Sequence, residues 1–172
     1  MKTSKKPPQT TRHFEELVTE FRKKAFLQQD LSAIDQHLTP DFVDHFAPTW
    51  DPPGIEGVRR RFGQAAQAFQ TKQVEIVHSI RKGKILMQAI RIHLRHTGDF
   101  MGMPPTGKDL SIAGFDAFEF RGDKLCAHWG VYDVSRIPDL LGMGLGALNA
   151  PGTQPTASPS WANMWRGEVH GS

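Results

Sequence analysis

The spacing of hydrophobic residues divides the chain into a helical first part and a strand-rich second part. In three segments, residues 13–30, 30–40 and 58–69, apolar residues recur every three or four positions. This period predicts amphipathic helices. Pro40 ends the second of them, because proline lacks the backbone N–H that a helix interior needs. Segment 41–57, which contains several Pro and Gly residues, is predicted to be a loop.

In the second part of the chain the period changes to two, which is typical of half-buried strands. Strands are expected in four segments: residues 73–80, 84–98, 110–121 and 124–133. Tight turns are predicted at Lys82-Gly83 and at Gly122-Asp123, and residues 98–109 are predicted to form a crossover rich in Gly and Pro. Helices followed by consecutive antiparallel strands predict an α+β domain.

Length and composition fit one globular domain with a tail at each end. The chain has 172 residues, of which 38% are hydrophobic and 23% are charged, and its net charge is +3. Residues 1–12 form a basic tail, residues 13–144 the domain, and residues 145–172 a second tail rich in Gly, Pro and Ser. Trp161 and Trp165 in the second tail are predicted to dock on the domain or on a neighbouring subunit.

Composition also narrows the expected location and partners. The basic tail has no apolar stretch of the kind found in secretory signals, and no apolar run approaches the length that crosses a membrane. Cys126 is the single cysteine, which excludes an internal disulfide and favours a reducing compartment. We therefore expect a cytoplasmic protein without a membrane partner. We expect no nucleic-acid partner either, because no basic surface pattern continues the tail.

The segment "SIAGFDAFEF" (residues 111–120) directs a carboxylate to the apolar side of a predicted strand. Asp116 alternates in phase with Phe118 and other apolar residues. With the predicted two-residue turn, Asp116 lies opposite Trp129. An apolar environment disfavours the ionised form, so the pKa of Asp116 is expected to rise, which suits a general acid or base near neutral pH. The alternative is a structural Asp that pairs with one Arg or Lys.

Three histidines lie in segments that could border the same interior. His96 shares the apolar side of its strand, and His45 belongs to the loop 41–57, which could close over the carboxylate. His128 falls on the opposite face, but a slip of one residue in the hairpin brings His128 in and turns Trp129 out. Each histidine by itself is more often structural than catalytic. None has the spacing of a metal motif, so no metal site is predicted.

Five short segments occur in an order that resembles a known family. They are "DFVDH", "GIEGVRRRF", "HTGDFMGMPPTGK", "GFDAF" and "AHWGVYDV". Together they make residues 14–144 similar to the SnoaL-like polyketide cyclases, also called ester cyclases. The resemblance implies a cone of the nuclear-transport-factor-2-like type, in which helices pack in the hollow of a strongly curved antiparallel sheet and leave a deep apolar pocket. It also implies a homodimer or a higher homo-oligomer.

The resemblance further implies a reaction without cofactor or metal, in which a ring closes by intramolecular aldol condensation of a hydrophobic small molecule. Asp116 resembles the acid/base residue that deprotonates the carbon next to an ester carbonyl. His96 resembles a second pocket residue that could assist the carbonyl oxygen, while the enolate is stabilised by delocalisation into the substrate. Further residues are implied to contact the substrate: His45, Trp50, Phe118, His128, Trp129 and Asp133.

Other functions are compatible with the same residues. The cone also supports isomerases, dehydratases and epoxide hydrolases, so the fold does not choose among them. An epoxide hydrolase would need an Asp-Arg-Asp network from Asp116, Asp133 and Arg91, but strand parity places Arg91 on the other face. Two alternatives come from other classes: a protein that binds a small molecule without catalysis, and an assembly module that uses the outer face of the sheet.

Overall fold

The computed structural model describes residues 10–142, in which helices come first and a curved sheet follows. The N-terminal part contains α1 (Thr11–Arg22), a π-helical turn η1 (Lys23–Leu27), α2 (Ser32–His37) and α3 (Ile55–Ala68). The 3₁₀ turn η2 (Val134–Arg136) and the short helix α4 (Ile137–Leu141) follow the last strand. Trp161 and Trp165, which are predicted to dock, lie outside the described residues.

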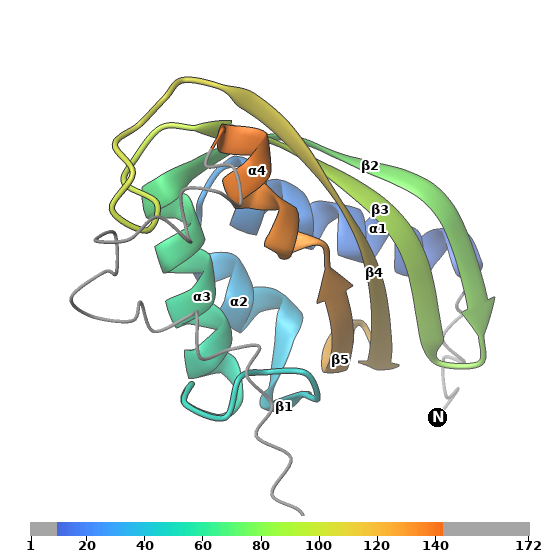
Figure 1. Cartoon of the computed structure of the whole chain (residues 1–172). Helices are drawn as coiled ribbons and strands as arrows, with labels where there is room; N and C mark the ends of the chain where they lie inside the picture. Colours follow the sequence, from blue (N-terminus) through green and yellow to red (C-terminus); the bar gives the residue numbers. More distant parts are fainter. Residues whose placement is uncertain (1–9, 143–172) are drawn as a thin grey trace, which may run out of the picture.

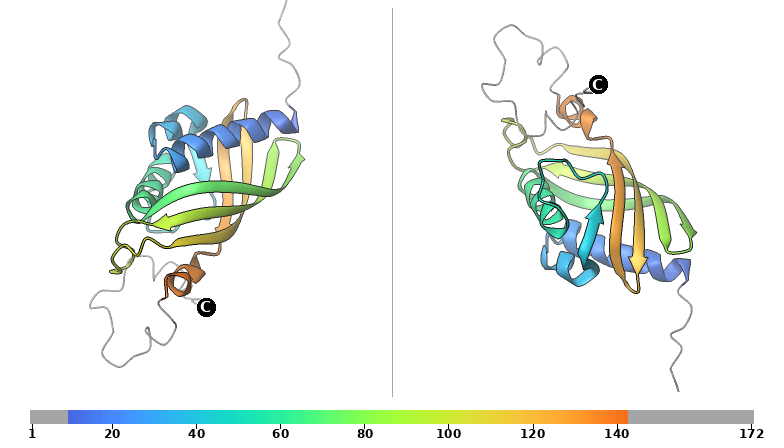
Figure 2. Two further views of the ribbon diagram at one scale, coloured as in Figure 1. Left: turned by 90° about the horizontal axis from the view of Figure 1, so that it is seen from above. Right: turned by 90° about the horizontal axis from the view of Figure 1, so that it is seen from below.

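Five strands form one sheet in the order β1-β5-β4-β3-β2. Their bounds are β1 (Leu38–Asp44), β2 (Phe69–Lys82), β3 (Ile85–His96), β4 (Asp109–Arg121) and β5 (Lys124–Tyr132). Strands β2 to β5 pair as antiparallel neighbours, whereas β1 pairs with β5 in parallel. The sheet bends around the N-terminal helices, and α1 runs along its concave side (Figures 1 and 2). This arrangement is the α+β architecture that the sequence predicts.

The concave side carries two clusters of buried apolar side chains. The first cluster joins α1, α2 and α3 to one end of the sheet, with Phe14, Val18, Ile34, Leu86 and Phe120 among its members. The second cluster lies towards the other end, and its buried members are Ala68, Phe69, Ile90, Ile92, Leu94, Leu110, Ile112, Ile137 and Leu141. Burial of these side chains is the main stabilising term of the domain. Leu86 and Ile90 belong to different clusters, so Gln88 between them marks the boundary.

One strand departs from the prediction. Residues 38–44 form β1, where the sequence pattern indicates the end of a helix and the beginning of a loop. Leu38 pairs with Leu125 and Val43 with Ala127, and Leu38 is almost fully buried. Hydrogen bonds to a partner 84 or more residues away decide this strand, and local periodicity does not contain that information. The first hairpin turn also shifts by one residue, because Lys82 pairs with Ile85.

A β-bulge in β5 changes which side chains face the concave side. The predicted pairs of Phe120 with Leu125 and of Arg121 with Lys124 are present, but Glu119 then pairs with Ala127. Cys126 is the additional residue, and it reverses the inward and outward alternation of the rest of the strand. The predicted pairing of Asp116 with Trp129 is therefore wrong. Gly130 stands opposite Asp116, and the inward side chain before it is that of His128.

Candidate functional site

Asp116 lies on the concave side of β4 at the boundary between the two apolar clusters. Only 3% of the residue is exposed. Its Oδ2 accepts a hydrogen bond from Arg22 Nη2 at 2.6 Å, and its Oδ1 lies 3.0 Å from His128 Nε2. The hydroxyl of Tyr132 also donates to Oδ1. Helix α1 and strand β5 thus bring three donors to one buried carboxylate on β4.

Arg22 enters the site from the last turn of α1 and is itself 4% exposed. Its Nη1 donates to Gln88 Oε1 at 2.6 Å, and Gln88 Nε2 donates to Ser79 Oγ at 3.3 Å. Gln88 is the direct cross-strand partner of Asp116, so the two acceptors of the guanidinium stand side by side. The guanidinium carbon lies 5.5 Å from the centre of the Phe118 ring, within the range of a cation–π contact. Arg22 is therefore held in one place by a fork of two hydrogen bonds.

His128 joins Asp116 to a second carboxylate. Its Nδ1 lies 3.3 Å from Asp44 Oδ1, and Asp44 in turn forms an ion pair with Arg61. Burial favours the neutral imidazole, but hydrogen bonds and charge from Asp116 and Asp44 outweigh it and raise the pKa of His128 to about 9. At neutral pH His128 is therefore an imidazolium that donates from both ring nitrogens.

The same contacts lower the pKa of Asp116. Burial by itself acts to raise it, but the hydrogen bond from His128 and the positive charges of Arg22 and His128 act more strongly in the other direction. The expected rise in the pKa of Asp116 is therefore wrong, because the apolar environment contains these donors. Tyr132 shows the opposite effect: burial and the adjacent Asp116 charge raise its pKa well above its ordinary value, so it stays a hydroxyl donor.

Two glycines, Gly130 and Gly114, have no side chain, and this leaves room for the rings of His128 and Tyr132. A Cβ at Gly130 would lie 2.5 Å from His128 Cε1 and 3.0 Å from Asp116 Oδ1. A Cβ at Gly114 would lie 2.5 Å from Tyr132 Cδ1. Real Cβ atoms do not approach other atoms this closely, so any larger residue displaces a donor ring.

His96, the second predicted catalytic residue, lies far from Asp116. It is on the concave side and fully buried, but it pairs with Phe69, whereas Asp116 is level with Gln88. His96 and Gln88 are eight residues apart along β3, which corresponds to roughly 25 Å of strand. His96 Nδ1 accepts from the backbone N–H of Thr106 at 3.2 Å, which fixes the segment after β3. The structure therefore does not bring the two predicted catalytic residues together.

The predicted substrate-contacting residues are divided between the two faces of the sheet. His128 and Phe118 lie on the concave side, and their rings stack with centres 4.8 Å apart. Trp129 points the other way, because it pairs with Ala117, and His45 stacks on it at 4.2 Å. His45 is exposed. These two aromatic residues therefore form a surface stack rather than a wall of the Asp116 site.

Trp50 and Asp133 lie outside the site as well. Trp50 is 38% exposed in the segment before α3. Asp133 directly follows β5, and its Oδ1 accepts from Ser135 Oγ at 3.1 Å. Its Oδ2 lies 3.8 Å from Arg136 Nε. Asp133 therefore stabilises the turn into α4 and does not contact Asp116 in the described structure.

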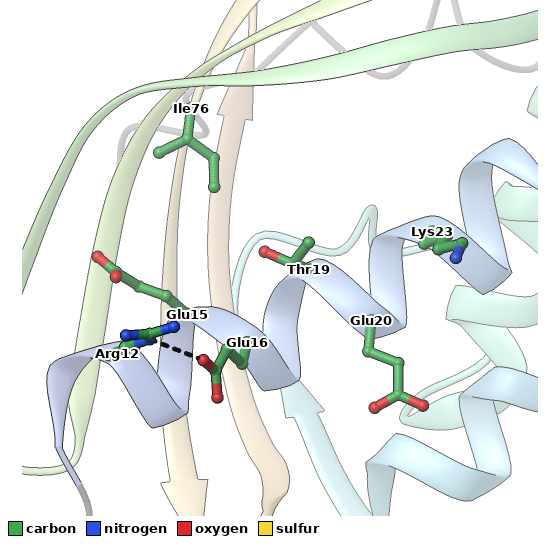
Figure 3. Close-up of a pocket in the computed structure, with 7 residues that line it drawn as sticks. All are labelled: Arg12, Glu15, Glu16, Thr19, Glu20, Lys23 and Ile76. Atoms are coloured by element: carbon green, nitrogen blue, oxygen red, sulfur yellow. Dashed lines mark hydrogen bonds and ion pairs between the residues drawn. The ribbon is translucent and has the colours of Figure 1, made fainter.

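Asp116 does not line either of the two best-defined pockets of the described residues. The first, of about 570 Å³, is a groove between the outer flank of α1 and β2 (Figure 3). Its lining residues are Arg12, Glu15, Glu16, Thr19, Glu20, Lys23 and Ile76. The second, of about 350 Å³, lies at the end of β4 and β5 and includes Phe115, Val131 and Tyr132. On the concave side, where a deep apolar pocket is expected, the side chains of Arg22 and Gln88 lie next to Asp116.

Four functional candidates were missed by sequence reasoning: Arg22, Asp44, Gln88 and Tyr132. Arg22 carried a usable signal. It shares the buried face of α1 with Val18 and Phe21, and a charge on an apolar face is the same signal that identifies Asp116. Tyr132 gave no such signal, because the bulge at Cys126 decides which way it points.

The described residues give no indication of a metal site or a membrane span. Among residues 10–142, no three His, Cys, Asp or Glu side chains are grouped so that they could hold a metal ion. Within the same range, no helix is both long and apolar enough to cross a membrane.

Comparison with known proteins identifies the family. The sequence profile described as SnoaL-like polyketide cyclase matches residues 16–138, which is most of the chain. This chain belongs to the SnoaL-like polyketide cyclase family. The segments "HTGDFMGMPPTGK", "GFDAF" and "AHWGVYDV" all lie within the matched range. A comparison with curated proteins gives no match.

Solved structures support the same fold. TsrD from Streptomyces laurentii is 20% identical, with a TM-score of 0.67 over 78% of this chain and 98% of its own. AclR from Streptomyces galilaeus, described as a proposed hydroxylase, is 24% identical, with a TM-score of 0.64 over 78% of this chain and 98% of its own. A proposed polyketide cyclase from Acidithiobacillus ferrooxidans is 20% identical, with a TM-score of 0.64 over 82% and 97% of the two chains. At identities this low the likeness shows the fold alone, a curved sheet with N-terminal helices on its concave side, and leaves the reaction open.

Proposed function

We propose that this SnoaL-like protein is an acid/base enzyme that acts without a cofactor on a hydrophobic carbonyl compound, by intramolecular aldol cyclisation of a polyketide ester. The observation that carries the proposal is the buried Asp116 carboxylate, held between the donors Arg22, His128 and Tyr132. Such a carboxylate is ionised at neutral pH and therefore available to accept a proton.

The reaction needs one group that first takes and then returns a proton. Asp116 accepts the proton from the carbon next to the ester carbonyl, and the electrons of the broken C–H bond form an enolate. The enolate carbon attacks a second carbonyl carbon of the same molecule, which closes the ring and leaves an alkoxide. Asp116 then gives its proton to that alkoxide oxygen, so no proton is gained or lost overall.

The low pKa of Asp116 makes it a weak base while Arg22 is its direct partner. A ligand oxygen that accepts a hydrogen bond from the guanidinium competes with the carboxylate for it and offsets part of the positive charge that lowers this pKa. Binding of the substrate would then strengthen the base at the moment when it is needed. The apolar clusters on either side of the site supply the surround in which charge interactions are strongest.

A second candidate is a binding protein without catalysis. One observation favours it: Asp116 and Arg22 are 3% and 4% exposed and satisfy each other, as in a structural ion pair. In that case the network specifies the packing of α1 on the sheet. This alternative predicts a ligand that binds and is released unchanged.

We also propose a homodimer in the cytoplasm, formed through the convex face of the sheet. Exposed apolar side chains cross β2, β3, β4 and β5 there: Ile80, Ile85, Met87, Phe115 and Val131. Phe115 pairs with Val131, and Ile80 pairs with Met87, so the side chains are neighbours on one surface. A continuous apolar surface of this kind is typical of subunit interfaces.

The test compares wild type with Asp116→Asn for cyclisation of an anthraquinone-type polyketide methyl ester. We expect activity in the wild type and a loss of at least 100-fold in the variant, the scale of a positioned acid/base group. Circular dichroism checks the fold. Asp139→Asn, on the exposed surface of α4, is the matched control and keeps full activity.

Two other outcomes of the cyclisation assay would contradict the proposal. Equal activity in wild type and Asp116→Asn contradicts the role of the carboxylate. No activity in either protein removes the named reaction and favours the binding protein, which ligand screening would then address.

A further inference from the structure

We propose that Arg22 binds the substrate oxygen on which negative charge develops, the task that the family resemblance implies for His96. The inference rests on the proposed function and deepens it, because it names the electrophilic partner of Asp116. It also departs from the expectation that delocalisation within the substrate alone stabilises the enolate.

The guanidinium of Arg22 is fixed before any ligand arrives. Gln88 and Asp116 stand opposite each other on β3 and β4, and each accepts one hydrogen bond of 2.6 Å from a different terminal nitrogen of Arg22. Phe118 lies against the guanidinium at 5.5 Å. A donor held in this way needs little reorganisation during a reaction, which is the condition for effective electrostatic stabilisation.

The distance between base and cation suits an enolisable group. The acidic carbon and the carbonyl oxygen of such a group are separated by one carbon atom. Asp116 Oδ2 and Arg22 Nη2 are adjacent atoms of one ion pair, 2.6 Å apart. A ligand that lies against both can present its C–H to the carboxylate and its oxygen to the guanidinium.

The movement of charge supports the same assignment. When the C–H bond breaks, its proton goes to Asp116 and its electrons shift through the new C=C bond to the oxygen. The negative charge therefore leaves the carboxylate and appears on the substrate oxygen, while Arg22 stays beside both. The net charge of the buried site does not change, so the low-dielectric surround imposes no additional cost.

His96 cannot serve this purpose in the described structure. It lies eight residues along β3 from Gln88, and its Nδ1 is occupied by the backbone N–H of Thr106. No described residue accepts a hydrogen bond from His96 Nε2, and the rings of Phe69 and Phe100 lie beside the imidazole. The role of His96 is therefore to hold the segment that follows β3.

The groove between α1 and β2 offers a way to reach Arg22. Thr19 of α1 and Lys23, the first residue of η1, line the groove (Figure 3), and Arg22 lies between them in the chain. Ile76 on the opposite wall pairs with Ile90, the inward residue next to Gln88 on β3. The π-helical turn begins at Lys23, directly after Arg22, and such turns are frequent at functional sites.

The test uses 2-naphthol, a flat phenol whose ionised form has its own absorption band and which resembles an enolate. Asp116→Asn removes the carboxylate and leaves Arg22 without its anionic partner. We expect this variant to bind naphtholate at least tenfold more tightly than wild type does, at a pH where free naphthol is neutral. Adding Arg22→Met should abolish ionisation of the bound probe. Adding Arg81→Met instead should leave it unchanged, because Arg81 packs over Phe14 and not at Asp116.

Several outcomes overturn the inference. They are a probe that stays neutral in Asp116→Asn, a probe that still ionises in the double variant with Arg22→Met, and a probe that binds none of the proteins up to its solubility limit. Thermal unfolding of each variant checks the fold, and Asp116→Ser replaces Asp116→Asn if the latter does not fold. Arg22→Lys keeps a cation without the fork, so partial ionisation is expected there.

This experiment separates the inference from the proposed function, because naphthol undergoes no reaction. Naphtholate binding that depends on Arg22 supports the inference even if no cyclisation is found. Loss of cyclisation in Asp116→Asn, together with a neutral bound probe, supports the proposed function and overturns the inference.

Discussion

At the scale of single residues, the chemistry depends on one buried carboxylate and on the imidazolium that bridges it to a second carboxylate. His128 contacts Asp116 with one ring nitrogen and Asp44 with the other. Each contact favours the protonated imidazole, and the pKa of His128 rises to about 9 against a usual value of 6.5. Protonation of this histidine and stability of the fold are therefore linked.

The link between protonation of His128 and folding predicts a loss of stability as the pH rises above neutral. A pKa raised in the folded state adds stability that is fully present below pH 6.5 and is lost as the pH rises through about 9. Urea unfolding between pH 6 and pH 10 should show a decrease of up to about 3 kcal/mol in the free energy of unfolding. His128→Gln should lack this decrease. A wild-type free energy that is flat to pH 10 contradicts the assignment.

Two carboxylates with lowered pKa values predict a loss of folding stability at low pH. The pKa of Asp116 and that of Asp44 are both lowered, because contacts with His128 and the charge of an arginine, Arg22 for Asp116 and Arg61 for Asp44, together outweigh burial. Stability from these carboxylates is present above their ordinary pKa near 3.8 and is lost as the pH falls through the lower folded values. The network is therefore best preserved between about pH 5 and pH 7.

A substitution at Gly130 tests whether the position of His128 matters. A Cβ there meets the imidazole at 2.5 Å, so Gly130→Ala should push His128 away from Asp116. We expect a loss of about 1–3 kcal/mol in stability and a pKa of His128 below that of wild type, measured by NMR titration. Gly63→Ala is the control: its nearest neighbour is Leu31 Cδ1 at 4.0 Å. In a helix this change should stabilise by about 0.5–1 kcal/mol.

At the scale of elements, α1 and β2 form the two walls of the groove that we propose as the access route. Filling this groove should slow access to Arg22 without disturbing the buried network. Ile76→Trp is expected to lower the association rate of 2-naphthol at least fivefold in stopped-flow measurements on the Asp116→Asn background. Lys72→Trp, on the same strand but outside the groove, serves as control. Equal rates for both tryptophan variants contradict access through this groove.

The elements also show which kinds of structure local patterns can predict. The three helices and four of the strands follow from a period of 3.6 or 2, because the pattern records which side of each segment is buried. The local pattern does not predict β1, because its strand structure depends on parallel pairing with β5. The local pattern does not predict the bulge at Cys126 either. Phe120 and Leu125 pair as predicted, and the shift appears only beyond Glu119.

At the scale of the whole molecule, the convex face of the sheet carries a group of exposed apolar side chains. Ile80 and Phe115 are each 68% exposed there. Leaving such side chains in water is unfavourable, and a second copy of the chain could cover them. The proposed dimer therefore depends on this face.

The dimer proposal predicts a change of mass on substitution. Wild type should run as a dimer in size-exclusion chromatography with light scattering, and Phe115→Glu should weaken dimerisation at least tenfold. Leu27→Glu is the control, because Leu27 is also exposed but lies in η1 and not among the side chains of the convex face. A monomeric wild type, or a dimer that Phe115→Glu leaves intact, contradicts the proposal.

The sequence by itself determined the order of helices and strands and the inward direction of Asp116, because both are written in the spacing of apolar residues. Only the tertiary structure decided what Asp116 meets. Arg22 reaches it from 94 residues away, and the bulge in β5 turns His128 and Tyr132 towards it. The pKa of a buried group depends on such neighbours more than on burial itself. The sequence therefore predicted a buried carboxylate, and its ionisation followed only once the helix and the sheet had met.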